Sequence, residues 1–187
     1  MKCKVGRYIG RAMMSGGAIS LLVALTLGSV KAAGDNNVRL FGALVSEPCV
    51  IPPGEENIEL DFGTVIDKYL YLNTRTQGQP FSISLAECDL NLGKTVRMAF
   101  VGTENPVLPG LLALDAGSQA TGIALGLETY DARPLKLNEI SSEMPLQAGS
   151  TLITLRAYVK GEPGAIANQN IGRGPFSVTV TFSLEYE

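Results

Sequence analysis

Residues 176–186 alternate strictly between apolar and polar side chains. The polar positions hold only Ser, Thr and Glu. The apolar positions are Phe176, Val178, Val180, Phe182, Leu184 and Tyr186. A period of two residues is that of a β-strand whose two faces meet different environments, and a helix cannot place such a pattern on one side. The chain must therefore contain a sheet that turns one face toward an apolar core.

Five further stretches are rich in β-branched and apolar residues, and clusters of Gly, Pro, Asn or Asp separate them. They are residues 58–65, 81–88, 95–101, 121–129 and 151–160. The last of these has one face made of Ile153, Leu155, Ala157 and Val159, and another made of Leu152, Thr154, Arg156 and Tyr158. Many short strands of this kind predict an all-β sandwich or barrel with one sheet face buried and one exposed to solvent.

The length of 187 residues, with 45% hydrophobic side chains, suits one well-buried core rather than two ordinary domains. Residues 66–76 and 134–148 are the stretches that leave room for short helical turns. A long amphipathic helix is not expected.

The first 32 residues have the pattern of a secretory signal peptide. Residues 1–11 are basic, residues 18–27 are mostly apolar, and Val30 and Ala32 stand at positions −3 and −1 of a cleavage site after Ala32. A membrane anchor would need about 20 mostly apolar residues, whereas Ser and Gly residues interrupt this stretch and Lys31 ends it. We expect the chain to be exported and its mature form to begin at Ala33.

Cleavage would leave 10 basic against 18 acidic residues, a net charge of −8, which argues against a nucleic-acid partner. The chain contains no His, so a His-based triad or a His-ligated metal site is excluded. No catalytic, nucleotide-binding or metal-binding motif is present, and Glu55, Glu56 and Asp61 fit a solvated surface. The glycines at 122 and 126 fit a strand with close backbone packing. We expect a protein without enzymatic activity, metal or small-molecule cofactor.

Cleavage would also remove Cys3 and leave Cys49 and Cys88 as the only thiols. An exported chain meets an oxidising compartment, so these two residues should form a disulfide. Redox-active pairs usually stand two residues apart, and this pair does not.

An ordered set of short motifs covers nearly the whole mature chain. Residues 37–44, in which Val38, Leu40, Gly42 and Leu44 share one parity, precede Pro48-Cys49. The later motifs are Asp61-Phe62-Gly63, residues 81–88 ending in Cys88, residues 121–125, Gly174 fourteenth from the end, and the penultimate Tyr186. This set resembles the fimbrial (pilus) subunits that the chaperone–usher pathway of Gram-negative bacteria assembles. Residues 95–104 and 108–110 look most like the minor or adaptor subunits of P-type or type 1 pili.

The resemblance implies an incomplete immunoglobulin-like sandwich that lacks its seventh strand and has a groove beside its last strand. A partner then supplies the missing strand, with backbone hydrogen bonds giving affinity and side-chain pockets giving register. In such a subunit, residues 33–47 form a donor-strand extension carrying Val38, Leu40, Gly42 and Leu44, and residues 48–187 form the pilin domain. The strand that accepts the partner carries Gly174, Phe176, Val178, Val180, Phe182, Leu184 and Tyr186.

The resemblance also implies the partners and the location. A periplasmic pilus chaperone pairs first with the C-terminal strand and grips the terminal carboxylate. At the outer-membrane usher, the extension of the next subunit replaces it. The protein would thus pass through the periplasm to the cell surface, become part of a fimbria and contribute to cell adhesion.

Two interpretations compete with this one. Residues 176–186 could be an ordinary core strand of a complete sandwich, and residues 38–44 could be a first strand that completes its own sheet. The protein would then be a secreted single-domain module that binds a ligand or glycan through loops such as 102–110 or 161–174. The disulfide is expected in either case, so the deciding question is whether the chain covers its own C-terminal strand.

Overall fold

The computed structural model describes residues 38–187. The predicted signal peptide of residues 1–32, Cys3 and residues 33–37 of the predicted extension lie outside the described residues. The chain divides between Gly42 and Ala43, and the two parts are described separately.

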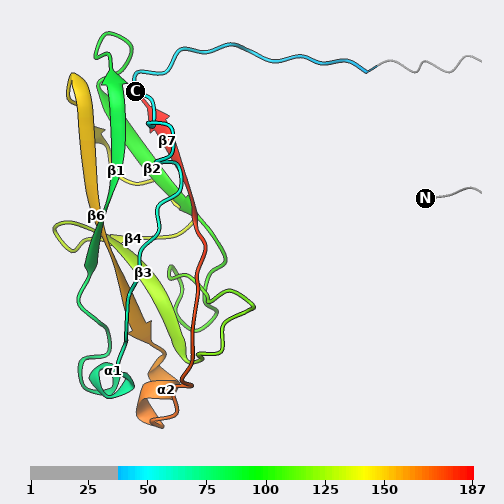
Figure 1. Cartoon of the computed structure of the whole chain (residues 1–187), viewed down its shortest axis with the longest axis vertical. Coiled ribbons are helices and arrows are strands. Elements are labelled where there is room, and N and C mark those ends of the chain that lie inside the picture. The colour runs from blue at the N-terminus through cyan, green and yellow to red at the C-terminus, as the bar shows by residue number, and fades with distance from the viewer. Residues whose placement is uncertain (1–37) are drawn as a thin grey trace, which may run out of the picture. The chain divides into compact units, whose positions relative to one another are not determined.

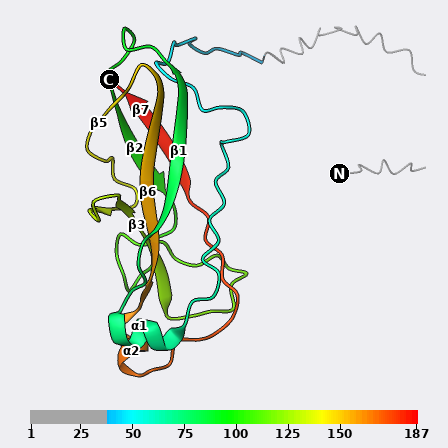
Figure 2. The same cartoon turned by 60° about the vertical axis from the view of Figure 1, so that its left-hand side comes forward.

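Residues from Ala43 onward form two antiparallel β-sheets and two short helices (Figure 1). One sheet has the strand order β1 (Gln79–Cys88), β6 (Gly149–Gly161), β3 (Ile123–Thr129) and β4 (Pro134–Leu135). The other has the order β5 (Met144–Pro145), β2 (Thr95–Val101) and β7 (Thr181–Tyr186). Helices α1 (Asp67–Asn73) and α2 (Pro163–Ala167) lie together at the end opposite the C-terminus, as Figure 2 also shows. The prediction of an all-β fold is confirmed.

The core lies between the two sheets and follows the period-two pattern of the sequence. From the first sheet it receives Ile83, Leu85, Ile153, Leu155, Ala157 and Val159. From β2 it receives Val96, Met98 and Phe100. Strand β6 therefore turns its predicted face of Ile153, Leu155, Ala157 and Val159 toward the other sheet, whereas β3 is buried at nearly every position. Neither helix among residues 38–187 is long and apolar enough to cross a membrane.

One residue on the outer face of β6 is buried, contrary to the prediction. The ring of Tyr158 lies under the Arg75 guanidinium, 3.6 Å from it, and burial raises the pKa of the Tyr158 hydroxyl. Both terminal nitrogens of Arg75 donate to the carboxylate of Glu128, at 2.9 Å each. Glu128 is only 2% exposed, so the ion pair replaces solvent over the tyrosine. The face of β6 that was predicted to be exposed to solvent is therefore partly covered by Arg75 and Glu128.

Gly126 lies in β3 directly under that tyrosine, where an added Cβ would collide with the Tyr158 ring. The predicted strand with close backbone packing is thus confirmed from Ile123 onward, whereas Gly122 lies just before β3 with a φ of 75°. We expect Gly126→Ala to lower the free energy of unfolding by about 1–3 kcal/mol, because the well-packed ring has to move. Urea denaturation measures this change. Gly117→Ala is the matched control, since no atom lies within 4 Å of its added Cβ; equal stability of the two variants would contradict the explanation.

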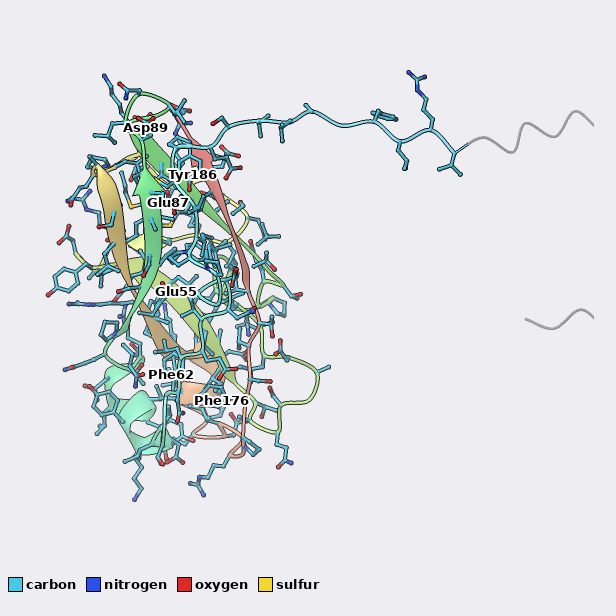
Figure 3. All side chains as sticks on the ribbon, turned by 45° about the horizontal axis from the view of Figure 1, so that its top comes forward. Glu55, Phe62, Glu87, Asp89, Phe176 and Tyr186 are labelled. Carbon is cyan, nitrogen blue, oxygen red and sulfur yellow. A yellow bond between two sulfur atoms is a disulfide. The ribbon has the colours of Figure 1, made fainter. Side chains whose placement is uncertain are left out.

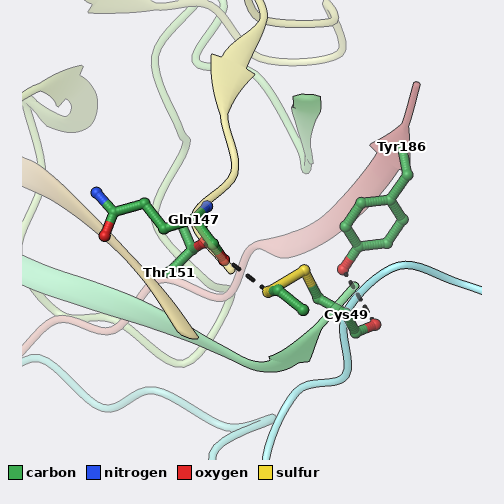
Figure 4. The surroundings of a disulfide bond; sticks show 5 residues. Cys49, Gln147, Thr151 and Tyr186 are labelled. Atoms are coloured by element: carbon green, nitrogen blue, oxygen red, sulfur yellow. Dashed lines mark hydrogen bonds between the residues drawn. A yellow bond between two sulfur atoms is a disulfide. The ribbon is translucent and has the colours of Figure 1, made fainter. Parts of the chain in front are cut away.

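The disulfide between Cys49 and Cys88 is confirmed. It joins the start of the domain to the end of β1, and next to it Val50 and Ala86 exchange two backbone hydrogen bonds of 2.9 and 2.8 Å. Figure 4 shows the Tyr186 hydroxyl over the same site, donating to the Cys49 carbonyl at 3.5 Å. The bridge therefore fixes Cys49 against β1, and the Tyr186 hydrogen bond joins the same residue to β7.

Two predictions of secondary structure are wrong. Residues 58–65 are extended but pair with neither sheet, and residues 176–180 precede β7 rather than belonging to it. Of the two stretches that left room for a helical turn, 66–76 contains α1 and 134–148 contains the short strands β4 and β5. Helix α2 was not predicted. A periodic pattern shows which side chains are buried, but a ladder also needs a neighbouring backbone, which periodicity does not encode.

Candidate functional site

Strand β7 is an edge strand, because it pairs with β2 on one side and ends the sheet on the other. Glu187, directly after β7, exchanges two backbone hydrogen bonds of 3.0 Å with Thr95, directly at the start of β2. Backbone groups of successive strand residues point to opposite sides. Phe182, Leu184 and Tyr186 therefore direct their backbone N–H and C=O groups away from β2.

The extended residues before β7 continue the same edge. The Ser177 carbonyl accepts a 2.9 Å bond from the Asp115 amide, and the Thr179 amide donates to the Asp115 carboxylate at 3.2 Å. These bonds all lie on one side of the segment. Within the part of the chain that the structure describes, the backbone groups of Phe176, Val178 and Val180 have no protein partner. We call residues 176–186, on the side away from β2, the open edge.

The side chains of the open edge show that it is also an opening in the core. All its apolar residues touch the core cluster, yet each is only half-buried. They are Phe176, Val178, Val180, Phe182, Leu184 and Tyr186. Val96, Met98 and Phe100 on the neighbouring strand are fully buried. An ordinary core strand would be covered to the same depth as its neighbour, so that alternative does not describe residues 176–186.

Residues 58–65 run beside the open edge without pairing to it. Phe62 of this segment and Phe176 have ring centroids 6.3 Å apart, and Figure 3 shows them side by side. Leu60, Phe62 and Val65 are half-buried against the core. The Gly63 amide donates to the Asp61 carboxylate at 2.7 Å, a local turn contact. The two segments thus share apolar contacts but no backbone hydrogen-bond ladder. Residues 58–65 therefore do not complete the sheet at the open edge.

Gly174 has the backbone conformation with which the chain enters the open edge. Its φ is 150°, and an added Cβ would lie 2.6 Å from the Cβ of Gln119. The following carbonyl, of Pro175, accepts the Gln119 amide at 2.8 Å. Only glycine lets the chain pass this close. The sequence pattern singled out Gly174, and its structural reason is this approach.

An ion pair at the same end was not predicted. Arg173 donates to one carboxylate oxygen of Asp67 at 2.9 and 2.6 Å, which joins the chain before the open edge to α1. The hydrogen bonds from Arg173 hold the pKa of the Asp67 carboxyl below its usual value. The two residues are 106 positions apart, so no local pattern could have found the pair.

Tyr186 lies at the opposite end of the open edge. Burial raises the pKa of its hydroxyl, with the Glu47 carboxylate adding to the shift. The ring thus stays a neutral phenol that fills space and donates to the Cys49 carbonyl. A structural role for the penultimate tyrosine follows from these contacts.

The residues before the domain form no part of either sheet. Val38, Leu40 and Leu44 are almost wholly exposed, and an added Cβ on Gly42 would meet no atom within 4 Å. Residues 38–44 are thus not a first strand that completes its own sheet. Their role as a donor strand stays a prediction.

No three Cys, Asp or Glu residues among 38–187 are placed to hold a metal ion together. The geometry of the described residues thus centres on an unpaired strand edge and an exposed apolar extension. Comparison with known proteins explains this combination.

A family model described as fimbrial protein matches residues 37–187. This chain belongs to the fimbrial protein family. Among its relatives, the fimbrial adapter PapK of Escherichia coli is 30% identical over 178 residues, which cover 92% of this chain and 98% of PapK. The uncharacterized fimbrial-like protein YfcP of Escherichia coli strain K12 is 29% identical over 182 residues, 95% of this chain and 99% of YfcP.

The crystal structure of the P pilus rod subunit PapA has the same fold, with a TM-score of 0.65 at 21% identity over 75% of this chain and 100% of that one. The fold is therefore the incomplete immunoglobulin-like sandwich expected from the sequence. The protein is a fimbrial subunit of chaperone–usher pili, located in a surface fimbria and in contact with other pilus subunits. Its family consists of structural subunits, which confirms that it is not an enzyme.

Proposed function

We propose that this fimbrial subunit enters its fibre by donor-strand exchange. The N-terminal extension of one neighbour fills the open edge, and the subunit's own extension fills the same edge of another neighbour. The single observation that carries this proposal is the half-buried apolar face of residues 176–186 beside unpaired backbone groups. Such an edge is a template for an added strand.

The exposed side chains of the extension match this need. Burial of Val38, Leu40 and Leu44 would each contribute roughly 1.5–3 kcal/mol as an upper bound. Each new backbone hydrogen bond adds about 0.5–1.5 kcal/mol. These three residues are exposed in their own subunit, so their apolar surface can still be buried against a partner.

The same edge requires protection before assembly, because an unpaired strand beside an open core aggregates. A periplasmic chaperone that lends a strand supplies this protection, and the outer-membrane usher is where the next extension replaces it. This route requires export, which the signal-peptide pattern of residues 1–32 supports. In this proposal residues 33–47 are the donor extension and residues 48–187 the pilin domain.

The position in the fibre is proposed to be that of a minor or adaptor subunit that contributes to cell adhesion. The likeness to the fimbrial adapter PapK supports it, and so does the motif of residues 95–104 and 108–110. An open edge and an extension in one chain suit an internal place between two neighbours. Family membership favours this role over a secreted single-domain binding module.

Gly42→Val is expected to reduce incorporation of the subunit into fimbriae severalfold, because a Cβ and its methyl groups would keep the donor backbone from a shallow part of the neighbour's core. The subunit's own stability should not change, since no atom lies within 4 Å of the added Cβ. The measurement compares the amount of tagged subunit in shed fimbriae with the amount in the periplasm, alongside thermal melting.

Ala43→Val is the matched control, because residue 43 has the opposite parity and its side chain would point away from the neighbour's core. We expect this variant to assemble like the parent. If Gly42→Val and the parent reach the fibre in equal amounts, residues 38–44 do not insert in the proposed register.

A further inference from the structure

Helix α1 exposes apolar side chains that the subunit's own core does not use. Leu70 is buried and anchors the helix, whereas Leu72 is 83% exposed, Ile66 60% and Tyr69 41%. We call Ile66, Tyr69 and Leu72 the α1 patch. Ile66 and Tyr69 also line an open hollow of about 440 Å³ that includes Phe62. Three large apolar side chains around one seven-residue helix indicate a surface that another molecule covers.

The α1 patch lies at the end of the open edge where the C-terminal segment begins. Ile66 directly follows residues 58–65, whose Phe62 contacts Phe176, the first apolar residue of the open edge. Arg173 binds α1 through Asp67. Figure 1 places both helices at one end of the sheets and the C-terminus at the other. A strand that fills the open edge therefore has one of its ends beside the α1 patch.

The following step rests on the proposed donor-strand exchange and concerns the direction of the donor. The opposite end of the domain is where its own extension joins it, because the Pro48 carbonyl accepts the Asp89 amide at 2.8 Å and the Glu187 carbonyl accepts the Lys94 amide at 2.7 Å. A donor strand parallel to β7 would bring the donor's domain to this end, where the acceptor's own extension already joins. An antiparallel donor strand brings the donor's domain to the end with α1. Antiparallel pairing is also slightly more stable than parallel pairing. A head-to-tail fibre requires the two neighbours at different ends.

The length of the connection then decides how close the donor's domain must come. Only Val45, Ser46 and Glu47 stand between Leu44, the last apolar residue of the donor strand, and Pro48, where the domain begins. Four extended steps span at most about 14 Å. A domain tied this closely to the end of the open edge has to lie against the surface there.

We propose that the α1 patch binds the domain of the neighbouring subunit whose extension fills the open edge. The extension and the patch thus form one continuous interface, with the domain-to-domain contact setting how rigidly successive subunits are held. The occupant is the end of a fimbrial subunit from which its extension leaves.

The test uses two full-length mature chains that can form only one complex. The acceptor carries Leu40→Asp and Leu44→Asp in its extension, so it cannot donate. The donor is a second copy of this chain with residues 36–46 repeated after Glu187 on a flexible linker, so its own edge is filled. Calorimetry or interferometry measures the Kd of this pair, and the Kd of the same acceptor for a synthetic peptide of residues 36–47.

The patch variant is an acceptor with Tyr69→Ser and Leu72→Ser. The matched control is an acceptor with Leu152→Ser, a leucine on β6 that is 66% exposed and lies outside α1. We expect the patch variant to bind the donor copy at least about tenfold more weakly than the control does, as loss of one buried leucine implies. Its Kd for the peptide should not change, which also shows that the variant is folded.

Equal affinity of the patch variant and the Leu152→Ser control for the donor copy would overturn the inference while leaving donor-strand exchange in place. Equal weakening toward the peptide and the donor copy would overturn it as well, because the patch would then act through the open edge. If no acceptor binds the peptide or the donor copy, donor-strand exchange between copies of this chain does not occur, and the inference fails with it.

Discussion

A copy of residues 36–46 joined after Glu187 by a flexible linker is expected to raise the melting temperature of the mature chain by roughly 10 °C or more, at about 2–4 °C per kcal/mol for a chain of this size. The added segment supplies Val38, Leu40 and Leu44 to the half-buried face of the open edge. The tether makes the insertion intramolecular, so little association entropy is lost. Expression of residues 33–187 in an oxidising periplasm, with and without the segment, gives the soluble monomer yield and the melting temperature.

The matched control carries the same linker and segment with Leu40→Asp and Leu44→Asp in the added copy only. It should melt like the unextended chain, because the charged side chains cannot enter the core. A native form that is already a stable monomer, indifferent to the added strand, would show that the sandwich is complete and that the open edge has no partner.

Replacement of both Cys49 and Cys88 by Ser is expected to lower the free energy of unfolding by about 4 kcal/mol, the value that the chain-entropy model gives for a loop of this length. The two cysteines are 39 positions apart and join the start of the domain to the end of β1. Without the bridge, the contact between the Cys49 carbonyl and Tyr186 at the end of the open edge also loses its anchor. Urea denaturation measures the loss.

Reduction of the parent protein provides the control for this variant. The parent in excess reductant should fall to the stability of the double-Ser variant, and the variant itself should not respond to reductant. A loss below about 1 kcal/mol would mean that the remaining contacts hold the chain start in place without the covalent bond.

Much of the fold could be predicted because each signal was local. The alternation in residues 151–160 gave Ile153 and Leu155 one common face, and the structure has both in the core. The disulfide between Cys49 and Cys88 could be predicted without a structure, because these are the only two cysteines left after the expected loss of Cys3. By contrast, Arg75, Glu128 and Tyr158 meet from distant parts of the chain, so the burial of the tyrosine was not foreseen.

For the candidate site, the sequence by itself determined which residues carry apolar side chains at every second position, in 176–186 and again in 38–44. It could not determine whether those faces are covered, because the same period suits a core strand and an edge strand. Only the tertiary structure decided this. It placed β7 at the edge of its sheet, left residues 58–65 without a ladder, and left 38–44 outside both sheets. The physical reason is that a strand's side chains are specified by its own residues, whereas its backbone partners depend on how distant segments are arranged.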